Sequence, residues 1–191
     1  AILLALIVCA AVIVGLVHMN PLGVYKAIFD GALGSSRRIW ITIRDTLVLL
    51  CIAVGLAPAF KMKFWNIGAE GQVLMGGLMT ALVMVNFGNT LPAPVLMLLM
   101  LLSSIVAGGI WGLIPAFFKA KWKTNETLFT LMMNYVATSI VACAVNVLRG
   151  QASSLGKLNM STHAGWFPKL WGQTYNTNII VVVILTFVMF L

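Results

Sequence analysis

Charged side chains are scarce in this chain of 191 residues: Asp, Glu, Lys and Arg together make up 8%. A soluble domain carries roughly a quarter charged residues, because its surface faces water. Apolar residues reach 61%, and the mean hydropathy is +1.04. Most of the surface of this protein is therefore expected to face lipid.

Motifs that carry catalytic chemistry are missing from the sequence as well. It has no GxxxxGK[ST] phosphate-binding loop, no HExxH pair and no Ser/His/Asp or Cys/His set. Cys9, Cys51 and Cys143 lie inside apolar runs without a CxxC spacing, which is typical of small buried apolar side chains. We expect no metal, no cofactor and no enzymatic activity in this chain.

Acidic residues are outnumbered, since 12 Lys and Arg face 4 Asp and Glu, giving a formal charge of +8. The basic residues fall between apolar segments, where cytoplasmic loops beside anionic lipid collect them. There is no basic patch with interleaved aromatic residues. The expected partner is therefore membrane lipid, and no nucleic acid is expected.

Long uncharged runs predict membrane-spanning helices, because a hydrocarbon core of about 30 Å takes roughly 20 apolar residues. Val95–Phe118 and Thr127–Leu148 are complete spans by this measure. Ala1–Val17 and Asn178–Leu191 are apolar runs at the two ends of the sequence, and we expect truncated spans there. The prediction is an all-α polytopic transmembrane bundle of about six spans or part-spans, a single domain over 1–191 that is truncated at both ends.

Two further segments are less regular. Leu47–Phe60 is short for a span and carries Pro58 near its end, while Phe64–Val85 contains an acid and several glycines. Short hydrophobic segments interrupted by Gly or Pro are typical of discontinuous transporter helices. We therefore expect a discontinuous helix near 64–72, where Asn66–Gln72 is either a helix start at the interface or a broken helix beside a pathway.

The remaining segments are more polar. Within 20–40 we expect a short interfacial helix over Leu22–Phe29, followed by a loop. Arg149–Thr177 is the longest hydrophilic stretch and is expected to form an external loop that holds Trp166 and Trp171 near the headgroups.

Lysines decide the expected orientation. Lys61 and Lys63 lie on one short connection, and the lysines of 119–123 lie on another. Alternating spans place both connections on one side, which the positive-inside rule makes cytoplasmic. The turn Asn86–Pro94 then lies outside and Ala1 lies on the cytoplasmic side. On this scheme Lys26, Arg37 and Arg38 fall outside, against the rule.

Glu70 is the only acid within Phe64–Val85. A carboxylate inside a span is costly unless it is paired or hydrated, so Glu70 is a candidate functional residue. The alternative is a place in the first helical turn, where the helix dipole favours an acid and Asn66 could cap the helix. The two interpretations are compatible if the helix starts within the membrane.

Two other polar positions leave alternatives open. Thr124 or Asn125 can cap the following span, with Glu126 in its first turn, or this stretch contacts a cytoplasmic partner. Asn134 lies about a third of the way into its span, where it either joins helices or lines a polar pathway. The cytoplasmic face is expected to carry Lys119, Lys121, Lys123, Asn125 and Glu126.

Glycines expected to let helices approach closely are Gly76, Gly77, Gly108, Gly109 and Gly112.

Two long motifs resemble a known family. The run FWNIGAEGQ over 64–72 resembles the FNIGAEGQ signature of permeases from bacterial ABC importers for nucleosides and simple sugars, with Trp65 in a position usually held by Phe or a similar residue. Downstream, residues 119–121, 124–126 and 131–137 look like the KA[KR]xxxNE…TLMLNYIA block of the same branched-chain amino acid and ribose-type permease superfamily. Weaker matches are Asn20-Pro21 and Leu148-Arg149-Gly150.

This resemblance implies a permease subunit of an ATP-driven importer, which lines the pathway for a nucleoside or simple sugar across the bacterial inner membrane. It also implies three kinds of partner: ABC ATPase subunits that hydrolyse ATP, a second homologous permease subunit and an extracytoplasmic substrate-binding lipoprotein. The polar residues predicted for the pathway are Asn66, Glu70, Gln72 and Asn134. The alternative is a secondary transporter or channel with Glu70 as its ion- or proton-coupling group.

Overall fold

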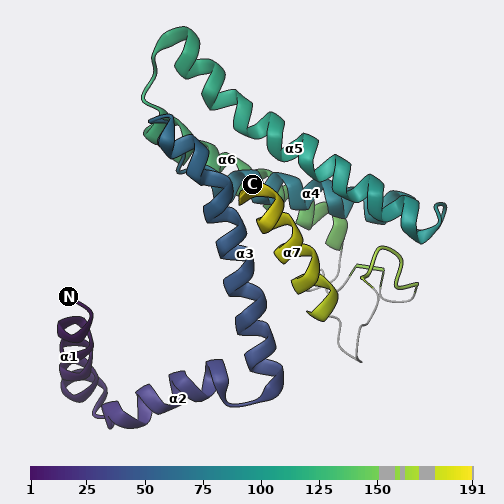
Figure 1. Cartoon of the computed structure of the whole chain (residues 1–191). Helices are drawn as coiled ribbons and strands as arrows, with labels where there is room; N and C mark the ends of the chain where they lie inside the picture. The colour runs from purple at the N-terminus through teal and green to yellow at the C-terminus, as the bar shows by residue number, and fades with distance from the viewer. Residues whose placement is uncertain (151–157, 160–161, 168–174, 191) are drawn as a thin grey trace. The chain divides into compact units, whose positions relative to one another are not determined.

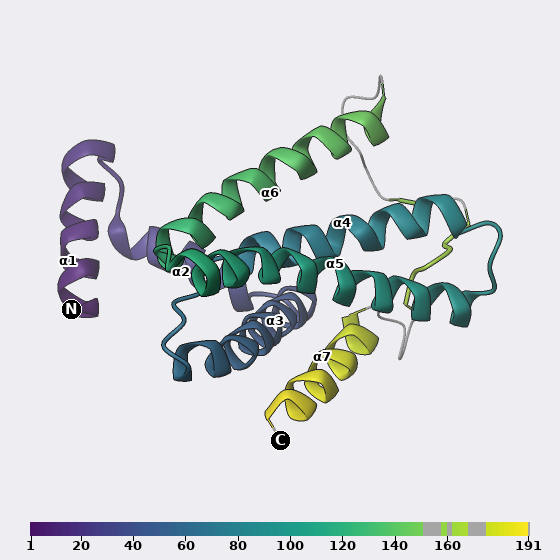
Figure 2. The same ribbon diagram turned by 90° about the horizontal axis from the view of Figure 1, so that it is seen from above.

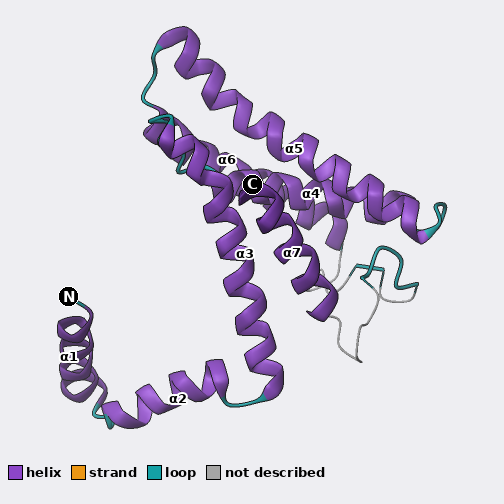
Figure 3. Cartoon of the chain, in the orientation of Figure 1, coloured by secondary structure: helices purple, strands orange, loops and turns teal. Residues whose placement is uncertain are grey.

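The computed structural model describes residues 1–150, 158–159, 162–167 and 175–190. Every regular element in these ranges is a helix, which confirms the predicted all-α class (Figures 1 and 3). In chain order the elements are α1 (Ile2–Val12), the π-helical turn η1 (Ile13–Val17), α2 (Pro21–Leu33), α3 (Ser36–Lys61), α4 (Ala69–Phe87), α5 (Ala93–Trp122), α6 (Glu126–Arg149) and α7 (Tyr175–Phe190).

Four helices of the described chain, α3 to α6, are each long and apolar enough to cross a membrane. A fifth span is possible if Ile2–Val17 and Pro21–Leu33 are counted as one bent pair, and Ile179–Phe190 is a shorter apolar helix. The predicted polytopic transmembrane bundle is therefore confirmed. The complete spans expected at Val95–Phe118 and Thr127–Leu148 lie within α5 and α6.

Residues of the described chain group into two compact units, Ala1–Cys51 with Lys169–Leu191 and Ile52–Pro168. The single domain expected over 1–191 stays a prediction.

In the first unit, the chain bends by 114° between Ile2–Val17 and Pro21–Leu33. The side chain of Asn20 accepts a hydrogen bond from Leu22 N at 3.0 Å and Pro21 occupies the first turn, so α2 starts anew after the bend.

The loop expected after Phe29 is wrong, because α2 continues to Leu33 and α3 begins at Ser36. Its polar groups are used at the junction between these two helices. Arg38 Nη1 donates to Asp30 O at 2.7 Å, and Thr42 Oγ1 donates to Ala32 O at 3.0 Å. Carbonyl groups at the end of α2 thus find donors on α3.

The apolar run Leu47–Phe60, which is short by itself, is the second half of the 26-residue helix α3. The first half contains Arg44 and Asp45, whose side chains pair at 2.7 Å. Counting uncharged residues alone therefore underestimated the length of this helix. Pro58 lies in its last turn, close to its end at Lys61.

In the second unit, α4 packs against both α5 and α6 (Figure 2). Small residues allow the close approach between α4 and α5. A Cβ atom at Gly76 would lie 2.9 Å from Ser104 Oγ, and one at Gly112 would lie 2.9 Å from Gln72 Nε2. A Cβ at Gly108 would also contact Gln72. The expected role in close helix approach is confirmed for these three glycines, whereas Gly77 and Gly109 have no atom of the described residues within 4 Å of a Cβ.

The two lysine-bearing connections lie at the same end of this unit, as expected. Lys119 Nζ, near the end of α5, donates to the carbonyl oxygen of Lys63 after α3 at 3.4 Å. At the other end of α4, Asn159 Nδ2 donates to Met84 O at 2.9 Å. The described residues 158–159 and 162–167 thus lie near the end of α4 opposite the lysines, as the external-loop prediction requires.

Of the two tryptophans expected near the headgroups, Trp166 is half-buried and its Nε1 donates to Leu158 O at 3.0 Å. Trp171 lies outside the described residues.

The adjacent glycines of α4 offer a matched test of this packing. Gly76→Leu forces a side chain into Ser104 of α5, so the free energy of unfolding should fall by about 1–3 kcal/mol. Gly77→Leu faces open space and should change it by no more than about 0.5 kcal/mol. Denaturant titration of the full-length protein in detergent micelles measures both, and equal losses would contradict the packing of α4 on α5 described above.

Candidate functional site

A short stretch of non-helical backbone, in which Asn66 and Gly68 are buried, leads into α4. After α3 ends at Lys61, the chain makes a turn and then runs through Asn66, Ile67 and Gly68 before α4 begins at Ala69. Asn66 Oδ1 accepts a hydrogen bond from Gly68 N at 2.9 Å, and both residues are buried. We call residues 64–71 the α4 entry segment.

The structure decides between the two interpretations of Asn66–Gln72. This stretch is the start of a helix, with Gly68 as the N-cap residue of α4 and Glu70 in its first turn. Residues 64–72 are therefore not an interruption within one long helix, because α3 ends at Lys61 and α4 begins at Ala69. The sharp bend between two apolar helices lies instead at residues 18–20.

Two side chains of α6 hold the entry segment. Asn134 Nδ2 donates to Ile67 O at 3.0 Å, and Asn134 Oδ1 accepts from Gly71 N at 2.9 Å. Thr130 Oγ1 accepts from Ile67 N at 3.2 Å and donates to Glu126 O at 2.7 Å. Thr130 and Asn134 are four residues apart, so they lie on one face of α6.

Asn134 therefore caps α4 from a different helix. The first N–H groups of a helix have no partner inside the helix and need an external acceptor. Gly68 makes no side-chain cap, and Asn66 bonds the N–H of Gly68 itself, so Asn134 Oδ1 serves Gly71 N instead. The expected capping of α4 by Asn66 is thus replaced by a turn at Asn66 and a cap from Asn134.

The glycines of the entry segment are needed for this contact. A Cβ atom at Gly71 would lie 2.9 Å from Asn134 Oδ1 and 3.0 Å from Trp111 Nε1. One at Gly68 would lie 3.0 Å from Thr130 Cβ. Any larger residue would push the entry segment away from α6. Close packing against α6 therefore explains why the motif has glycine at these two positions.

The four predicted pathway residues do not form one cluster. Asn66 and Asn134 are buried and both bond the entry segment. Glu70 is exposed, and within the described residues its carboxylate forms no hydrogen bond or ion pair. Gln72 packs its side-chain amide against Gly112 of α5. Successive helical residues point about 100° apart, which separates Glu70 from Gln72. Their role in a pathway stays a prediction.

Two residues of this site were missed from the sequence. Thr130 precedes Asn134 by one helical turn, and this spacing on the same face of α6 is the signal that could have found it. Trp111 lies beside Gly71, and its buried Nε1 has no partner among the described residues. Nothing in the sequence around Trp111 points to this contact.

A second polar cluster lies at the lysine-bearing end. Lys119 Nζ pairs with Glu126 Oε1 at 2.6 Å and lies 5.2 Å from the centre of the Phe64 ring. Asn125 caps α6 by accepting from Leu128 N at 3.2 Å, and Glu126 occupies the first turn. The capping interpretation of residues 124–126 is therefore confirmed, with Asn125 as the cap.

The remaining residues expected on the cytoplasmic face lie at the same end. Lys121 Nζ lies 4.9 Å from the centre of the Trp122 ring, and Lys123 ends α5 with a positive φ of 52°. The position of Lys119, Lys121, Lys123, Asn125 and Glu126 relative to the cytoplasm stays a prediction.

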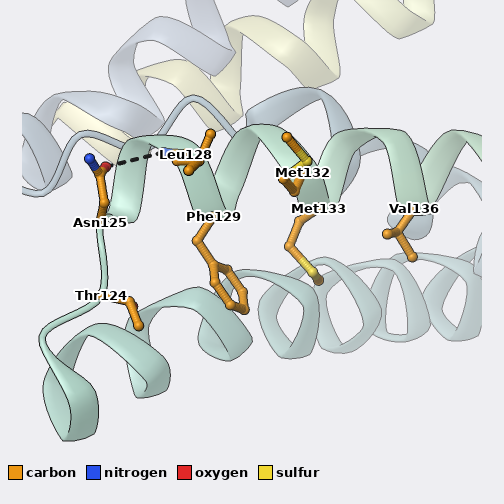
Figure 4. A pocket seen from close by; sticks show the side chains of 7 residues that line it. All are labelled: Thr124, Asn125, Leu128, Phe129, Met132, Met133 and Val136. Atoms are coloured by element: carbon orange, nitrogen blue, oxygen red, sulfur yellow. Dashed lines mark hydrogen bonds between the residues drawn. The ribbon is translucent and has the colours of Figure 1, made fainter.

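A shallow groove runs along α6, and its lining is almost entirely apolar (Figure 4). Its side chains are Thr124, Asn125, Leu128, Phe129, Met132, Met133 and Val136. No ionisable side chain lines this groove, so it offers neither an acid nor a base. The described residues also hold no group of three or more His, Cys, Asp or Glu side chains that could bind a metal.

Comparison with known proteins places the chain in a family. The profile of the family described as "branched-chain amino acid transport system / permease component" matches residues 39–191. The protein therefore belongs to this family of membrane transport permeases, and it is an integral membrane protein with several spanning helices. The matched region includes the entry segment and its partners on α6.

Several curated relatives are transporter permeases. The chain is 35% identical over 138 residues to the guanosine ABC transporter permease protein of Bacillus subtilis, covering 72% of this chain and 39% of that protein. It is 34% identical over 139 residues to the glucose ABC transporter permease protein of Haloferax volcanii, covering 73% and 36%. With the nucleoside ABC transporter permease protein of Lactococcus lactis it shares 28% over 180 residues, covering 89% and 49%.

The chain thus spans less than half the length of each of these three relatives. No solved structure matches it at a significant level.

Removing the contact from α6 tests the entry segment. Asn134→Leu leaves the buried N–H of Gly71 and the part-buried carbonyl of Ile67 without their partner, so the free energy of unfolding should fall by about 2–4 kcal/mol. Asn146→Leu, at an exposed position of the same helix, should change it by about 0.5 kcal/mol or less. Denaturant titration of both variants in detergent would refute the Asn134 cap if their losses were equal.

A double-mutant cycle tests the ion pair that joins α5 to α6. Lys119→Met and Glu126→Gln should couple by about 0.5–1 kcal/mol, because the pair is partly exposed. Lys121→Met combined with Glu126→Gln should show no coupling, since Lys121 contacts aromatic rings instead. The measurement is thermal unfolding of the five variants and wild type, and equal coupling in both cycles would contradict a specific pair.

Proposed function

We propose that this chain is part of the permease subunit of an ATP-driven importer, which moves a nucleoside or a simple sugar across the bacterial plasma membrane. The observation that carries the proposal is its similarity to permeases named for guanosine, for nucleosides and for glucose. Two of these three names are nucleoside transporters, so a nucleoside is our first choice of cargo.

The proposed subunit works with partners. Its sequence has no phosphate-binding loop, so ATP would be hydrolysed by separate ABC ATPase subunits. A second homologous permease would complete the pathway, and an extracytoplasmic substrate-binding lipoprotein would deliver the cargo. Weak binding inside the permease suits this arrangement, because the external protein captures the cargo and the permease must release it.

The geometry divides the proposed pathway residues by what their side chains can do. Asn66 and Asn134 use amide groups on the α4 entry segment, so they would act on transport mainly by holding that segment. The carboxylate of Glu70 is exposed, and Gln72 is half-buried beside α5. Glu70 is therefore the residue of this set best able to contact a polar cargo directly.

A second candidate function rests on the same carboxylate. An exposed, unpaired acid at the start of a membrane-spanning helix suits a site that binds a proton or a cation. In this alternative the protein is a secondary transporter or channel, and Glu70 couples the movement of the ion to that of the cargo. Family membership favours the importer.

Uptake into liposomes tests the proposal. The full-length permease is reconstituted with its ATPase subunits, its second permease and its binding protein, and supplied with labelled guanosine, ribose or glucose. We expect uptake of guanosine that requires ATP and is competed by other nucleosides but not by the sugars. Uptake of a sugar alone would keep the mechanism and change the cargo.

The Glu70→Gln variant separates the two candidates in the same assay. If the protein is an importer, its uptake should still depend on ATP and should ignore an imposed pH gradient. Uptake driven by a pH gradient without ATP, and abolished by Glu70→Gln, would overturn the importer and establish the secondary transporter.

A further inference from the structure

The lysine-bearing end of the second unit collects positive charge from two connections. Lys61 and Lys63 follow α3, and Lys119, Lys121 and Lys123 close α5. The acids near this end are Glu126, which pairs with Lys119, and Glu70 in the first turn of α4. Five lysines against two acids leave a net charge of +3. We call Lys61, Lys63, Lys121 and Lys123 the basic patch.

The lysines of the basic patch are available to a ligand. All four are exposed, and none forms an ion pair within the described residues. Lys119 is different, because its ammonium group is held by Glu126 and by the carbonyl oxygen of Lys63. That contact ties the connection after α3 to the end of α5, so the patch is one surface rather than two independent loops.

Exposed aromatic rings border the basic patch. Trp65 is 60% exposed and Trp122 is 54% exposed. The Trp65 ring packs edge-on against Phe60 at 5.7 Å, and Lys121 Nζ lies 4.9 Å from the centre of the Trp122 ring. Tryptophan in this setting prefers the boundary between acyl chains and headgroups, because its ring is apolar and its N–H is polar.

The patch directly adjoins helix surface that is suited to lipid chains. Phe60, near the end of α3, and Phe117 and Leu113, on α5, are exposed apolar side chains within one or a few turns of the lysines. A lysine at the end of such a helix extends its ammonium group to the level of the headgroups while its stem covers apolar surface. The chemistry that meets it at this depth is a lipid phosphate.

We propose that the basic patch, with Trp65 and Trp122, is a binding surface for the headgroups of anionic phospholipids. The lysines would contact phosphate groups, and the two tryptophans would sit at the headgroup boundary beside them. A net positive charge next to lipid-facing helices favours this occupant over an acidic protein surface, which would have to reach the patch past the headgroups. The proposal does not depend on which cargo the permease carries.

Quenching of tryptophan fluorescence by brominated lipids tests the proposal in the full-length permease. Vesicles contain phosphatidylcholine with increasing brominated phosphatidylglycerol, and brominated phosphatidylcholine provides the reference. Each Lys→Gln change in the patch should lower the preference for phosphatidylglycerol by up to about fivefold, and the fourfold variant by at least about tenfold. High salt should weaken the wild-type preference.

Matched variants keep the experiment decisive if the fourfold variant fails to fold. The corresponding Lys→Arg changes keep the charge and should keep the preference. The Lys26→Gln, Arg37→Gln double variant removes two exposed charges of the first unit and should leave the preference unchanged, whereas Lys63→Gln with Lys123→Gln should lower it.

Two outcomes would overturn the proposal. One is an equal affinity of the wild type for phosphatidylglycerol and phosphatidylcholine. The other is an unchanged lipid preference in the Lys63→Gln, Lys123→Gln variant; weaker co-purification of the ATPase subunits with that variant would then assign the patch to a protein partner.

Discussion

Hydrogen bonding of the backbone that leads into α4 is the constraint on which the second unit depends. Non-helical backbone persists within a membrane protein only where other groups satisfy its N–H and C=O groups, since hydrocarbon offers no partners. Here α6 supplies them, through Asn134 to Ile67 O and Gly71 N and through Thr130 to Ile67 N. Because α4 also packs on α5, this one contact relates the start of α4 to both of its neighbours.

The same contact explains why two separate motifs accompany each other in the sequence. The runs 64–72 and 131–137 contact each other in the structure, where Asn134 of the second run packs against Gly71 of the first. Gly71 leaves room for Asn134 and Gly68 leaves room for Thr130. The acid and amide residues of these two motifs suggest a cargo site. In the structure, however, the side chains of Asn66 and Asn134 bond the backbone at the start of α4. Glu70 and Gln72 are the polar members whose side chains stay outside this contact.

Sequence patterns predicted the helical class, the membrane location and the spans α5 and α6, because runs of apolar residues measure the thickness of a bilayer directly. They were less successful between residues 30 and 40. There glycines and serines suggested a loop, yet α3 begins at Ser36. A helix tolerates charged residues where they find partners, as Arg38 does at Asp30 O and Arg44 does at Asp45. Those partners become visible only once the helices are placed.

By itself, the sequence determined that this protein is an α-helical membrane protein with a permease signature and that five of its lysines gather on two connections. It also identified Asn66, Glu70, Gln72 and Asn134 as polar groups that need an explanation. Only the tertiary structure decided which of them bond backbone and which stay free. The reason is physical: Asn134 and its partners Gly71 and Ile67 are 63 and 67 residues apart in the chain, and a hydrogen bond over such a separation depends on how helices pack rather than on local periodicity.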